Sequence, residues 1–482
     1  MFRRCRRPKT LGVSLVLLVL CVQILHMLLE MQREATPAAS SGTFDTAFGS
    51  DFLKIAYGGI NNRLGRSQQS IRMYGPFAPD FSDSVGLKDL QRYDCVRALE
   101  GFQQHQPLPS APVKRLSDQD FIRLTKDCKQ FRSKYGYQRY RTVTQEELNF
   151  PLAFNILLYK DVDQLHILLR AIYRPHNSYC LHVDGNASPD VYSAASGLAN
   201  CLDNVFLVSQ RENITYGGFS RLQADINCMK NHMHRTSSNP HYTNETSLHQ
   251  QSTSPWRYLI NLPSQQFPLK TNLELVKILQ IYNGSNDIEG ITGGRMMRSR
   301  FAFKHEYRRH PNTGRVEIVK TDTPHPPPPH NITVVKGSAY GVFSRQFVQF
   351  LLQDARARDL LEWCRSVSSP DEYYWATLHH DAKLNAPGGY SGPPDKKPWL
   401  AVYASWPPRD LCLSGKSVRG VCIFGVRDLP QLVSRKELFA NKFYMDFQPE
   451  ALHCLDQWIM NKSRAALPVE TFYYRQLPFV RR

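Results

Sequence analysis

Between residues 150 and 363, short apolar runs alternate with longer segments in which apolar residues recur at helical spacing. Every residue of 152–158 except Asn155 is apolar, which is typical of a strand buried on both faces. In 161–173 the apolar residues share one side of a helix, at Leu165, Leu168, Leu169 and Ile172. The same alternation predicts strands at 178–183, 204–209, 256–262 and 337–343 and helices at 190–198, 219–234 and 345–363. Alternating strands and helices form parallel β–α–β units, so we expect an α/β domain.

Polar residues follow several of the predicted strands at the point where each strand ends. Tyr159 follows the first strand, Asp184 the second, and the loop 210–216 the third. Open parallel sheets bind their ligands beyond the carboxyl ends of the strands. We therefore expect a binding site at this edge of the sheet.

Three stretches lack this pattern. Residues 30–90 are rich in Ser, Gly, Asp and Arg, so we expect a stem that precedes the folded domain 91–482. Residues 235–255 are polar and of low complexity, which is typical of a surface loop, and 324–329 are mostly proline. The β–α–β pattern continues after each of these two stretches, so neither divides the domain.

A long apolar segment, 11–29, has about the ~20 residues that a helix needs to cross a bilayer. Five cations precede it: Arg3, Arg4, Arg6, Arg7 and Lys9. By the positive-inside rule, residues 1–10 form a cytoplasmic tail and the chain after 29 is translocated, which predicts a signal-anchor of type II topology. The alternative is a cleaved signal peptide, whose apolar region would be shorter and followed by a small-x-small cleavage site.

The cysteines and the glycosylation sequons agree with an oxidising, secretory compartment. Of the 11 cysteines, Cys5 and Cys21 lie in or before the apolar segment and nine follow it. Their scattered spacing argues against a zinc site and fits four disulfides with one free thiol. N-x-S/T sequons occur at Asn186, Asn213, Asn244, Asn283, Asn331 and Asn461.

The formal net charge is +18 at pH 7. A nucleic acid would fit this charge, but translocation across a membrane excludes it as a natural partner. An anionic substrate, such as a nucleotide sugar, and a merely basic surface both remain compatible with the charge.

The common catalytic motifs are missing. The sequence contains no HExxH, P-loop or GxSxG motif, so a protease, an NTPase and a serine hydrolase lack support. Asp161 and Asp163 form a D-x-D, a pattern that many nucleotide-sugar transferases use to hold a divalent metal. These two acids begin a predicted helix, however, and the helix dipole is the alternative explanation for them.

The most informative polar stretch is 369–377. Pro370 suits the first turn of a helix, Ser369 is a candidate N-cap, and Asp371 and Glu372 lie at the positive end of the helix dipole. Three aromatic residues follow at once. Two carboxylates beside an aromatic wall suit a general base, because one can stay ionised while partly desolvated. The alternative is an acidic first turn on a surface helix.

Several cations lie late in the chain. Lys416 and Arg419 fall in a loop that a disulfide between Cys412 and Cys422 would close, and Lys442 follows in an apolar setting. Fixed cations stabilise a leaving diphosphate, which is the task of a metal in other transferases. The alternative is a structural hairpin with solvated cations.

A family resemblance runs from Cys95 to Cys454, in order and at compatible spacing. It is carried by LLRAIYRPHNSYCLHVD (168–184), NVFLVSQ (204–210), Tyr216 with FSRLQADINCMK (219–230), WRYLINLPSQQFPLKTNLELVKIL (256–279), KGSAYGVFSR (336–345), SPDEYYWATL (369–378), VRGVCIFGVRDL (418–429) and LFANKF (438–443). Together these segments resemble the core 2/I-branching β-1,6-N-acetylglucosaminyltransferase family.

The resemblance implies a variant of the GT-A-type nucleotide-sugar transferase fold, with a single lumenal catalytic domain anchored in the Golgi membrane. It implies transfer of GlcNAc from UDP-GlcNAc to the 6-hydroxyl of a Gal or GalNAc residue of a glycoprotein glycan, with inversion and without a metal or other cofactor. Glu372 matches the family's catalytic base. The donor-side matches are Leu157, Leu158, Tyr159, Asp184, Gly185, Asn186, Tyr216, Arg419 and Lys442. The acceptor-side matches are Glu289, Arg300 and Tyr403.

The family's cysteine pattern implies the pairs Cys95–Cys454, Cys128–Cys201, Cys180–Cys228 and Cys412–Cys422, with Cys364 unpaired. This chain departs from the family where Tyr159 replaces a His, in the insertion 235–255, and in a short, divergent segment between Trp375 and Cys412. Two other interpretations remain open: a related metal-independent, xylosyltransferase-like enzyme and a catalytically inactive Golgi glycan-binding protein. Both an O-glycan core and poly-N-acetyllactosamine are compatible acceptors.

Overall fold

The computed structural model describes residues 95–101, 115–137, 143–237, 255–465 and 468–480. The expected cytoplasmic tail, the apolar segment 11–29, the stem 30–90 and most of the insertion 235–255 lie outside these residues. Within the described ranges, no helix is both long enough and apolar enough to cross a bilayer.

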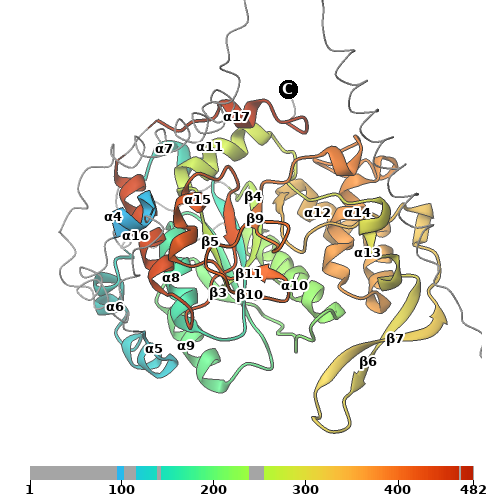
Figure 1. Ribbon diagram of the computed structural model, residues 1–482, viewed down its shortest axis with the longest axis horizontal. Coiled ribbons are helices and arrows are strands. Elements are labelled where there is room, and N and C mark those ends of the chain that lie inside the picture. Colours follow the sequence, from blue (N-terminus) through green and yellow to red (C-terminus); the bar gives the residue numbers. More distant parts are fainter. Residues whose placement is uncertain (1–94, 102–114, 138–142, 238–254, 466–467, 481–482) are drawn as a thin grey trace, which may run out of the picture. The chain divides into compact units, whose positions relative to one another are not determined.

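A five-stranded sheet of order β3–β2–β1–β4–β8 lies at the centre of the domain (Figure 1). Its strands are β1 (Leu152–Leu158), β2 (Ser178–Val183), β3 (Val205–Leu207), β4 (Tyr258–Pro263) and β8 (Val342–Ser344). β1 runs parallel to β2 and β4, and β2 runs parallel to β3, whereas the edge strand β8 is antiparallel to β4. The α/β class and the parallel sheet expected from the sequence are confirmed.

The helices follow the strands in the expected alternation. Those within and after the sheet are α8 (Val162–Ile172), α9 (Pro189–Asn200), α10 (Phe219–Ser237), α11 (Asn272–Tyr282), α12 (Arg345–Gln353), α13 (Ala355–Trp363) and α14 (Tyr374–His380). Further helices are α4 (Cys95–Glu100), α5 (Asp118–Leu124), α6 (Cys128–Lys134), α7 (Gln145–Leu148), α15 (Leu429–Val433), α16 (Glu450–Arg464) and α17 (Phe472–Arg475).

The side chains of β1 alternate between two apolar clusters, one on each face of the sheet. Phe154 and Ile156 belong to the cluster that includes residues of α8 and α9. Ala153 belongs to the other cluster, with residues of α10 and α12. Burial on both faces explains why this strand is a nearly continuous apolar run.

Asn155 interrupts that run because it binds a buried carboxylate on α10. Its amide donates to the backbone oxygen and to Oδ1 of Asp225, at 3.1 Å each. Asn261 of β4 donates to Oδ2 of Asp225 at 3.0 Å, and Arg221 pairs with the same oxygen at 2.6 Å. The fully buried Asp225 therefore ties α10 to two neighbouring strands.

Two sequence-based boundaries are wrong. The strand expected at 337–343 begins only at Val342, because the Asn261 side chain bonds the carbonyl of Ala339 and the N–H of Gly341 in place of a strand partner. The helix expected at 345–363 is two helices, α12 and α13. Asp354 separates them, since its side chain accepts a hydrogen bond from the N–H of Arg356 and caps α13.

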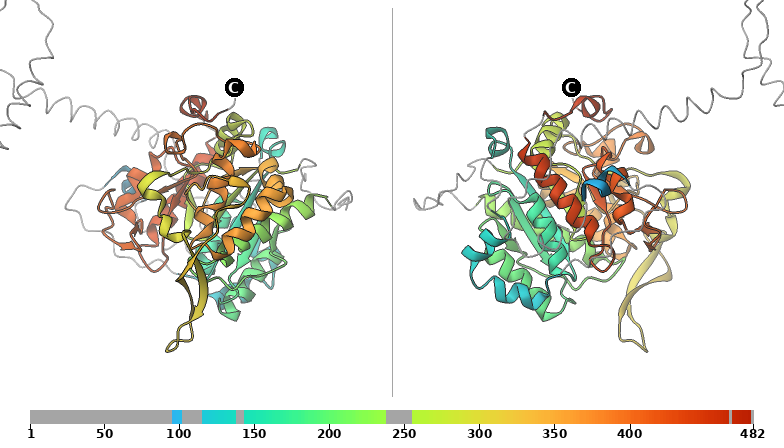
Figure 2. Two further views of the ribbon diagram at one scale, coloured as in Figure 1. Left: turned by 90° about the vertical axis from the view of Figure 1, so that its right-hand side faces the viewer. Right: turned by 60° about the vertical axis from the view of Figure 1, so that its left-hand side comes forward.

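A second sheet joins segments that are far apart in the chain. It has the order β5–β12–β9. Its strands are β5 (Gln266–Pro268), β12 (Phe439–Asn441) and β9 (Val402–Ala404). Its residues share an apolar cluster with α16, which packs against α8 through an ion pair between Arg170 and Asp456 (Figure 2).

Two antiparallel hairpins extend this framework. The longer one, of β6 (Phe303–Arg309) and β7 (Val316–Pro324), projects from the domain in every view (Figures 1 and 2). The shorter one pairs β10 (Ser417–Val418) with β11 (Val421–Cys422).

The described residues contain four disulfides, and they are the pairs that the family resemblance implies. They join Cys95 to Cys454, Cys128 to Cys201, Cys180 to Cys228 and Cys412 to Cys422, and Cys364 is buried and unpaired. The first bond spans a sequence separation of 359 residues and joins α4 to α16. This disulfide therefore links the first helix of the described domain to a helix near its C-terminal end.

Replacing both Cys95 and Cys454 by Ser should lower the free energy of unfolding by about 2–5 kcal/mol, because the unfolded chain loses a very long closed loop. Urea denaturation followed by tryptophan fluorescence measures this loss. Cys412 and Cys422 close a separation of 10 residues, so their double Ser variant is the control and should lose less. An equal or larger loss in the control would contradict the loop-entropy argument.

Candidate active site

Glu372 ends a 3-10 turn, η5 (Pro370–Glu372), that leads directly into α14. The expectation that Ser369 caps this segment is wrong, since its φ is 52° and its side chain makes no cap hydrogen bond. Its backbone N–H instead donates to the carbonyl of Gly217 at 2.6 Å, which ties the turn to the loop before α10. The three aromatic residues that follow Glu372 are fully buried and fix the turn in the core.

Two cations hold the Glu372 carboxylate by one of its oxygens. Nη1 of Arg300 lies 2.6 Å and Nζ of Lys336 lies 2.9 Å from Oε2. Within the part of the chain that the structure describes, Oε1 has no hydrogen-bond partner, and the side chain is 28% exposed. The carboxylate thus has one oxygen paired and the other free to accept a proton from a bound hydroxyl.

The neighbouring carboxyl group of Asp371 has a different environment. Burial raises the pKa of Asp371 to about 6, against the opposing influence of Arg221, and the carboxylates of Glu372 and Asp225 raise it further. The two adjacent acids therefore differ, since Asp371 is buried and Glu372 is partly exposed and paired with two cations. Different environments are what separate the roles of neighbouring carboxyl groups.

Glu289 belongs to the same group of charges. Burial raises the pKa of Glu289, Lys336 and Arg295 oppose this shift, and the carboxylate of Glu372 adds to it. The structure therefore brings the acceptor-side residues Glu289 and Arg300 together with Glu372. Sequence reasoning missed Lys336, because it directly precedes a run that was interpreted as a buried strand.

Tyr403, the third acceptor-side residue, is part of strand β9 in the second sheet. It is 8% exposed in β9, and its ring stacks on Phe424 with centroids 5.6 Å apart. The guanidinium of Arg435 lies 3.8 Å from the ring centre, and the hydroxyl accepts a hydrogen bond from Gln431 at 2.6 Å. These contacts make Tyr403 a core residue of the second sheet.

The donor-side residues follow the carboxyl ends of β1 and β2, as the strand pattern predicts. Leu157 and Leu158 are buried in β1, whereas Tyr159, just beyond the strand, is 59% exposed. The N–H of Asp184 donates to the carbonyl of Leu158 at 2.8 Å, so the end of β2 is fixed beside the end of β1. An exposed aromatic ring therefore stands next to a buried carboxylate at this edge.

The turn after β2 is built around Asp184. Its Oδ1 accepts hydrogen bonds from the N–H groups of Asn186 and Ile214, at 2.8 and 3.0 Å. A Cβ atom at Gly185 would lie 1.9 Å from Oδ1 of Asn213 and 3.2 Å from the carbonyl oxygen of Glu212, so this turn packs closely against residues 212–213. Asp184, Gly185 and Asn186 are thus one rigid corner.

Tyr216 and the late cations meet at the same edge. The guanidinium of Arg419 lies 3.9 Å from the centre of the Tyr216 ring, and Tyr216 is 68% exposed. Lys442 is half-buried; burial lowers its pKa, and the charge of Arg419 lowers it further. The structure therefore brings Tyr216, Arg419 and Lys442 together although they come from distant parts of the sequence.

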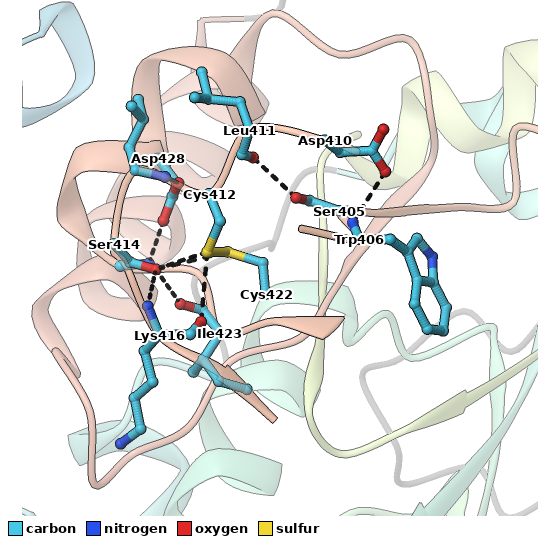
Figure 3. The surroundings of a disulfide bond; sticks show 12 residues. Ser405, Trp406, Asp410, Leu411, Cys412, Ser414, Lys416, Cys422, Ile423 and Asp428 are labelled. Atoms are coloured by element: carbon cyan, nitrogen blue, oxygen red, sulfur yellow. Dashed lines mark hydrogen bonds between the residues drawn. A yellow bond between two sulfur atoms is a disulfide. The ribbon is translucent and has the colours of Figure 1, made fainter. Parts of the chain in front are cut away.

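Arg419 occupies the turn of the β10–β11 hairpin. Arg419 and Gly420 have φ values of 55° and 76°, and two positive φ values are what a tight two-residue hairpin turn requires. A non-glycine residue is strained in this region, and such strain is often associated with function. The Cys412–Cys422 disulfide braces the hairpin, and the Ser414 hydroxyl beside it donates to the carbonyl of Ile423 at 2.7 Å (Figure 3).

The D-x-D carboxylates are engaged with the segment before the sheet. Asp163 is buried and accepts a hydrogen bond from the N–H of Leu116, and burial raises its pKa to about 6. Asp161 pairs with Arg115 at 2.8 Å, has a φ of 61°, and makes no side-chain cap hydrogen bond to α8. Among the residues that the structure describes, no group of three His, Cys, Asp or Glu side chains could hold a metal ion.

The buried position of Asp371 has a measurable pH signature. The pKa of Asp371 is about 6 in the folded protein and 3.8 in the unfolded chain. Between pH 3.8 and pH 6 the folded protein therefore holds a proton that the unfolded chain has released. The contribution of Asp371 to stability is full below pH 3.8 and is lost as pH rises through 6. Asp371→Asn should remove this slope and raise the free energy of unfolding at pH 7 by about 1–3 kcal/mol, measured by urea denaturation. The exposed Asp322→Asn is the control, and an unchanged slope in Asp371→Asn would refute the assignment.

A family model and known proteins match most of this chain by sequence. The family model of the core-2/I-branching enzymes matches residues 152–244 and 246–433. A human β-1,3-galactosyl-O-glycosyl-glycoprotein β-1,6-N-acetylglucosaminyltransferase is 34% identical over 401 residues, which cover 78% of this chain and 86% of the relative. A mouse N-acetyllactosaminide β-1,6-N-acetylglucosaminyl-transferase is 36% identical over 342 residues, which cover 69% of this chain and 79% of the relative. On these matches, the chain is a member of the core-2/I-branching enzyme family.

Proposed function

We propose that this protein transfers GlcNAc from UDP-GlcNAc in β-1,6 linkage to the 6-hydroxyl of a Gal or GalNAc residue of a glycoprotein glycan. The names of the relatives support the reaction, and their two acceptor types, an O-glycan core and N-acetyllactosamine, define the acceptors to test. The observation that carries the proposal is the half-paired Glu372 carboxylate, with Oε2 held by two cations and Oε1 free.

In the proposed mechanism Oε1 of Glu372 accepts the proton of the acceptor's 6-hydroxyl. The hydroxyl oxygen attacks C1 of the donor sugar from the face opposite UDP, so the C1–O bond to the diphosphate breaks as the new glycosidic bond forms. The configuration at C1 inverts in this single displacement. Glu289 and Arg300, which both interact with Glu372, would bind hydroxyl groups of the acceptor sugar in this proposal.

Arg419 and Lys442 take the charge of the leaving diphosphate in this proposal. Both are cations at the carboxyl edge of the sheet, and Lys442 is partly desolvated, which strengthens its attraction for an anion. We propose that no divalent metal takes part, since the D-x-D carboxylates are bound to other groups. The exposed Tyr216 and Tyr159 rings and the Asp184 corner would bind the uridine and ribose.

We also propose that the domain is a GT-A-type variant in the Golgi lumen, held by 11–29 as a type II signal-anchor. Relatives that modify glycoproteins support a secretory location, and the four disulfides fit an oxidising compartment. The proposed partners are therefore UDP-GlcNAc, a glycoprotein glycan and the membrane, and nucleic acid is not among them.

Glu372→Gln should lower turnover by about 10²–10⁴-fold while UDP still binds, because the amide cannot accept the proton. The full-length protein is assayed in detergent with UDP-GlcNAc, galactosyl and N-acetylgalactosaminyl acceptors and EDTA, and the linkage is determined by NMR. Glu362→Gln, an exposed carboxylate on α13, is the matched control. A wild-type protein with no β-1,6 product would overturn the proposed reaction, and an active Glu372→Gln would overturn only the base.

Arg419→Ala with Lys442→Ala should weaken UDP binding by about 10–100-fold per cation, since each charge-assisted contact contributes about 1.5–3 kcal/mol. Isothermal titration calorimetry with UDP measures the loss, and the exposed Lys129→Ala on α6 is the control. Restoration of wild-type activity by added Mn²⁺ would instead point to a metal at the D-x-D.

A further inference from the structure

Lys336 is the second cation on the Glu372 carboxylate, and no role was predicted for it from the sequence, although it begins the segment 336–345. Its Nζ lies 2.9 Å from Oε2, the oxygen that Arg300 also contacts. The Lys336 side chain is 14% exposed, less than the 25% of Arg300 and the 28% of Glu372. Lys336 is therefore the most buried of the three side chains in this group.

The backbone of Lys336 is fixed on both sides. Its N–H and carbonyl exchange hydrogen bonds with Ile291, at 3.1 and 2.7 Å, two residues after Glu289. On the preceding residue, Val335, the N–H and the carbonyl both bond the Thr377 hydroxyl of α14 at 3.1 Å. The backbone position of Lys336 is therefore fixed by the segment that contains Glu289 and by α14, the helix that follows Glu372.

The next residue, Gly337, brings these segments into contact. Its N–H donates to the backbone carbonyl of Glu372 at 2.6 Å. A Cβ atom at Gly337 would lie 2.3 Å from the carbonyl of Glu289 and 2.9 Å from the Cβ of Ala376. The segments that contain Glu289, Gly337 and Glu372 are therefore in van der Waals contact, and Lys336 lies where they meet.

We propose that Lys336 is a positioning residue for the proton transfer: it holds Glu372 by Oε2, so that Oε1 faces the acceptor hydroxyl. This inference rests on the proposed function and adds to it a residue that orients the base. Arg300 alone would leave the carboxylate a choice of orientations about a single contact. Two donors on one oxygen, from opposite segments, restrict the carboxylate to one.

Lys336 also acts on a second carboxylate, that of Glu289. The carboxylate of Glu372 raises the pKa of Glu289, and the charge of Lys336 lowers it. The charged or titratable groups that face Glu372 are Arg300, Lys336, Glu289, Asp371 and Tyr373. Without Lys336 this set loses a cation and keeps all its acids, so protonation of the base becomes easier.

The test is Lys336→Met in the full-length protein, assayed for transfer between pH 5 and 9. We expect kcat to fall by about 10–100-fold near pH 6, because the base is misplaced and more readily protonated. The acidic limb of the kcat/KM profile should move to higher pH by about one unit, so that the deficit is smaller at high pH. The dissociation constant for UDP should not change.

Lys336→Arg and Lys383→Met are the matched controls. Arginine keeps the charge and should restore most of the rate and the acidic limb, while Lys383 is exposed and its loss should change nothing. An unshifted acidic limb in Lys336→Met, or a Lys336→Arg variant as slow as Lys336→Met, would overturn the proposal. If the Met variant loses UDP binding through misfolding, the Lys336→Arg profile alone decides. If the wild-type protein itself gives no transfer, the proposed function fails instead, which separates the two outcomes.

Discussion

The carboxylate of Asp225 is the polar contact on which both the sheet and the acidic turn depend. It is fully buried, accepts the amides of Asn155 and Asn261 from adjacent strands, and pairs with Arg221 of its own helix. Each buried donor that loses its acceptor lowers the free energy of unfolding by about 1–3 kcal/mol. Removing the Asp225 carboxylate would leave several buried donors without an acceptor at once. Arg221 also acts on Asp371, so the same contact reaches the residue beside the proposed base.

Much of the framework follows from the sequence, because burial leaves a regular pattern. β1, β2, β4 and the helices α8 to α10 are each marked by apolar spacing, and parallel pairing brings their carboxyl ends to one edge. The turn that contains Asp184 lies at that edge. The positions of several proposed donor-side residues could therefore be predicted from the ends of the strands alone. Even the exception, Asn155, was visible as the one polar residue in an apolar strand.

Contacts between distant segments left no such pattern. Ser369 looked like an N-cap, but a hydrogen bond to Gly217 holds it at positive φ. Tyr403 lies in the short strand β9, and the burial of its ring against Phe424 is a contact that the sequence did not mark. Lys336 stands at a crossing of three segments, and only the tertiary structure brings such a lysine to a carboxylate.

The bond between Cys95 and Cys454 has a consequence for the order of events during synthesis. Cys95 is the first cysteine of the described domain to leave the ribosome, and Cys454 is the last in the chain. The partners of all other disulfides emerge between them, so the Cys95 thiol is exposed to each of these cysteines before its own partner exists. Correct closure therefore requires that the inner pairs form first or that wrong pairs are exchanged by attack of another thiolate.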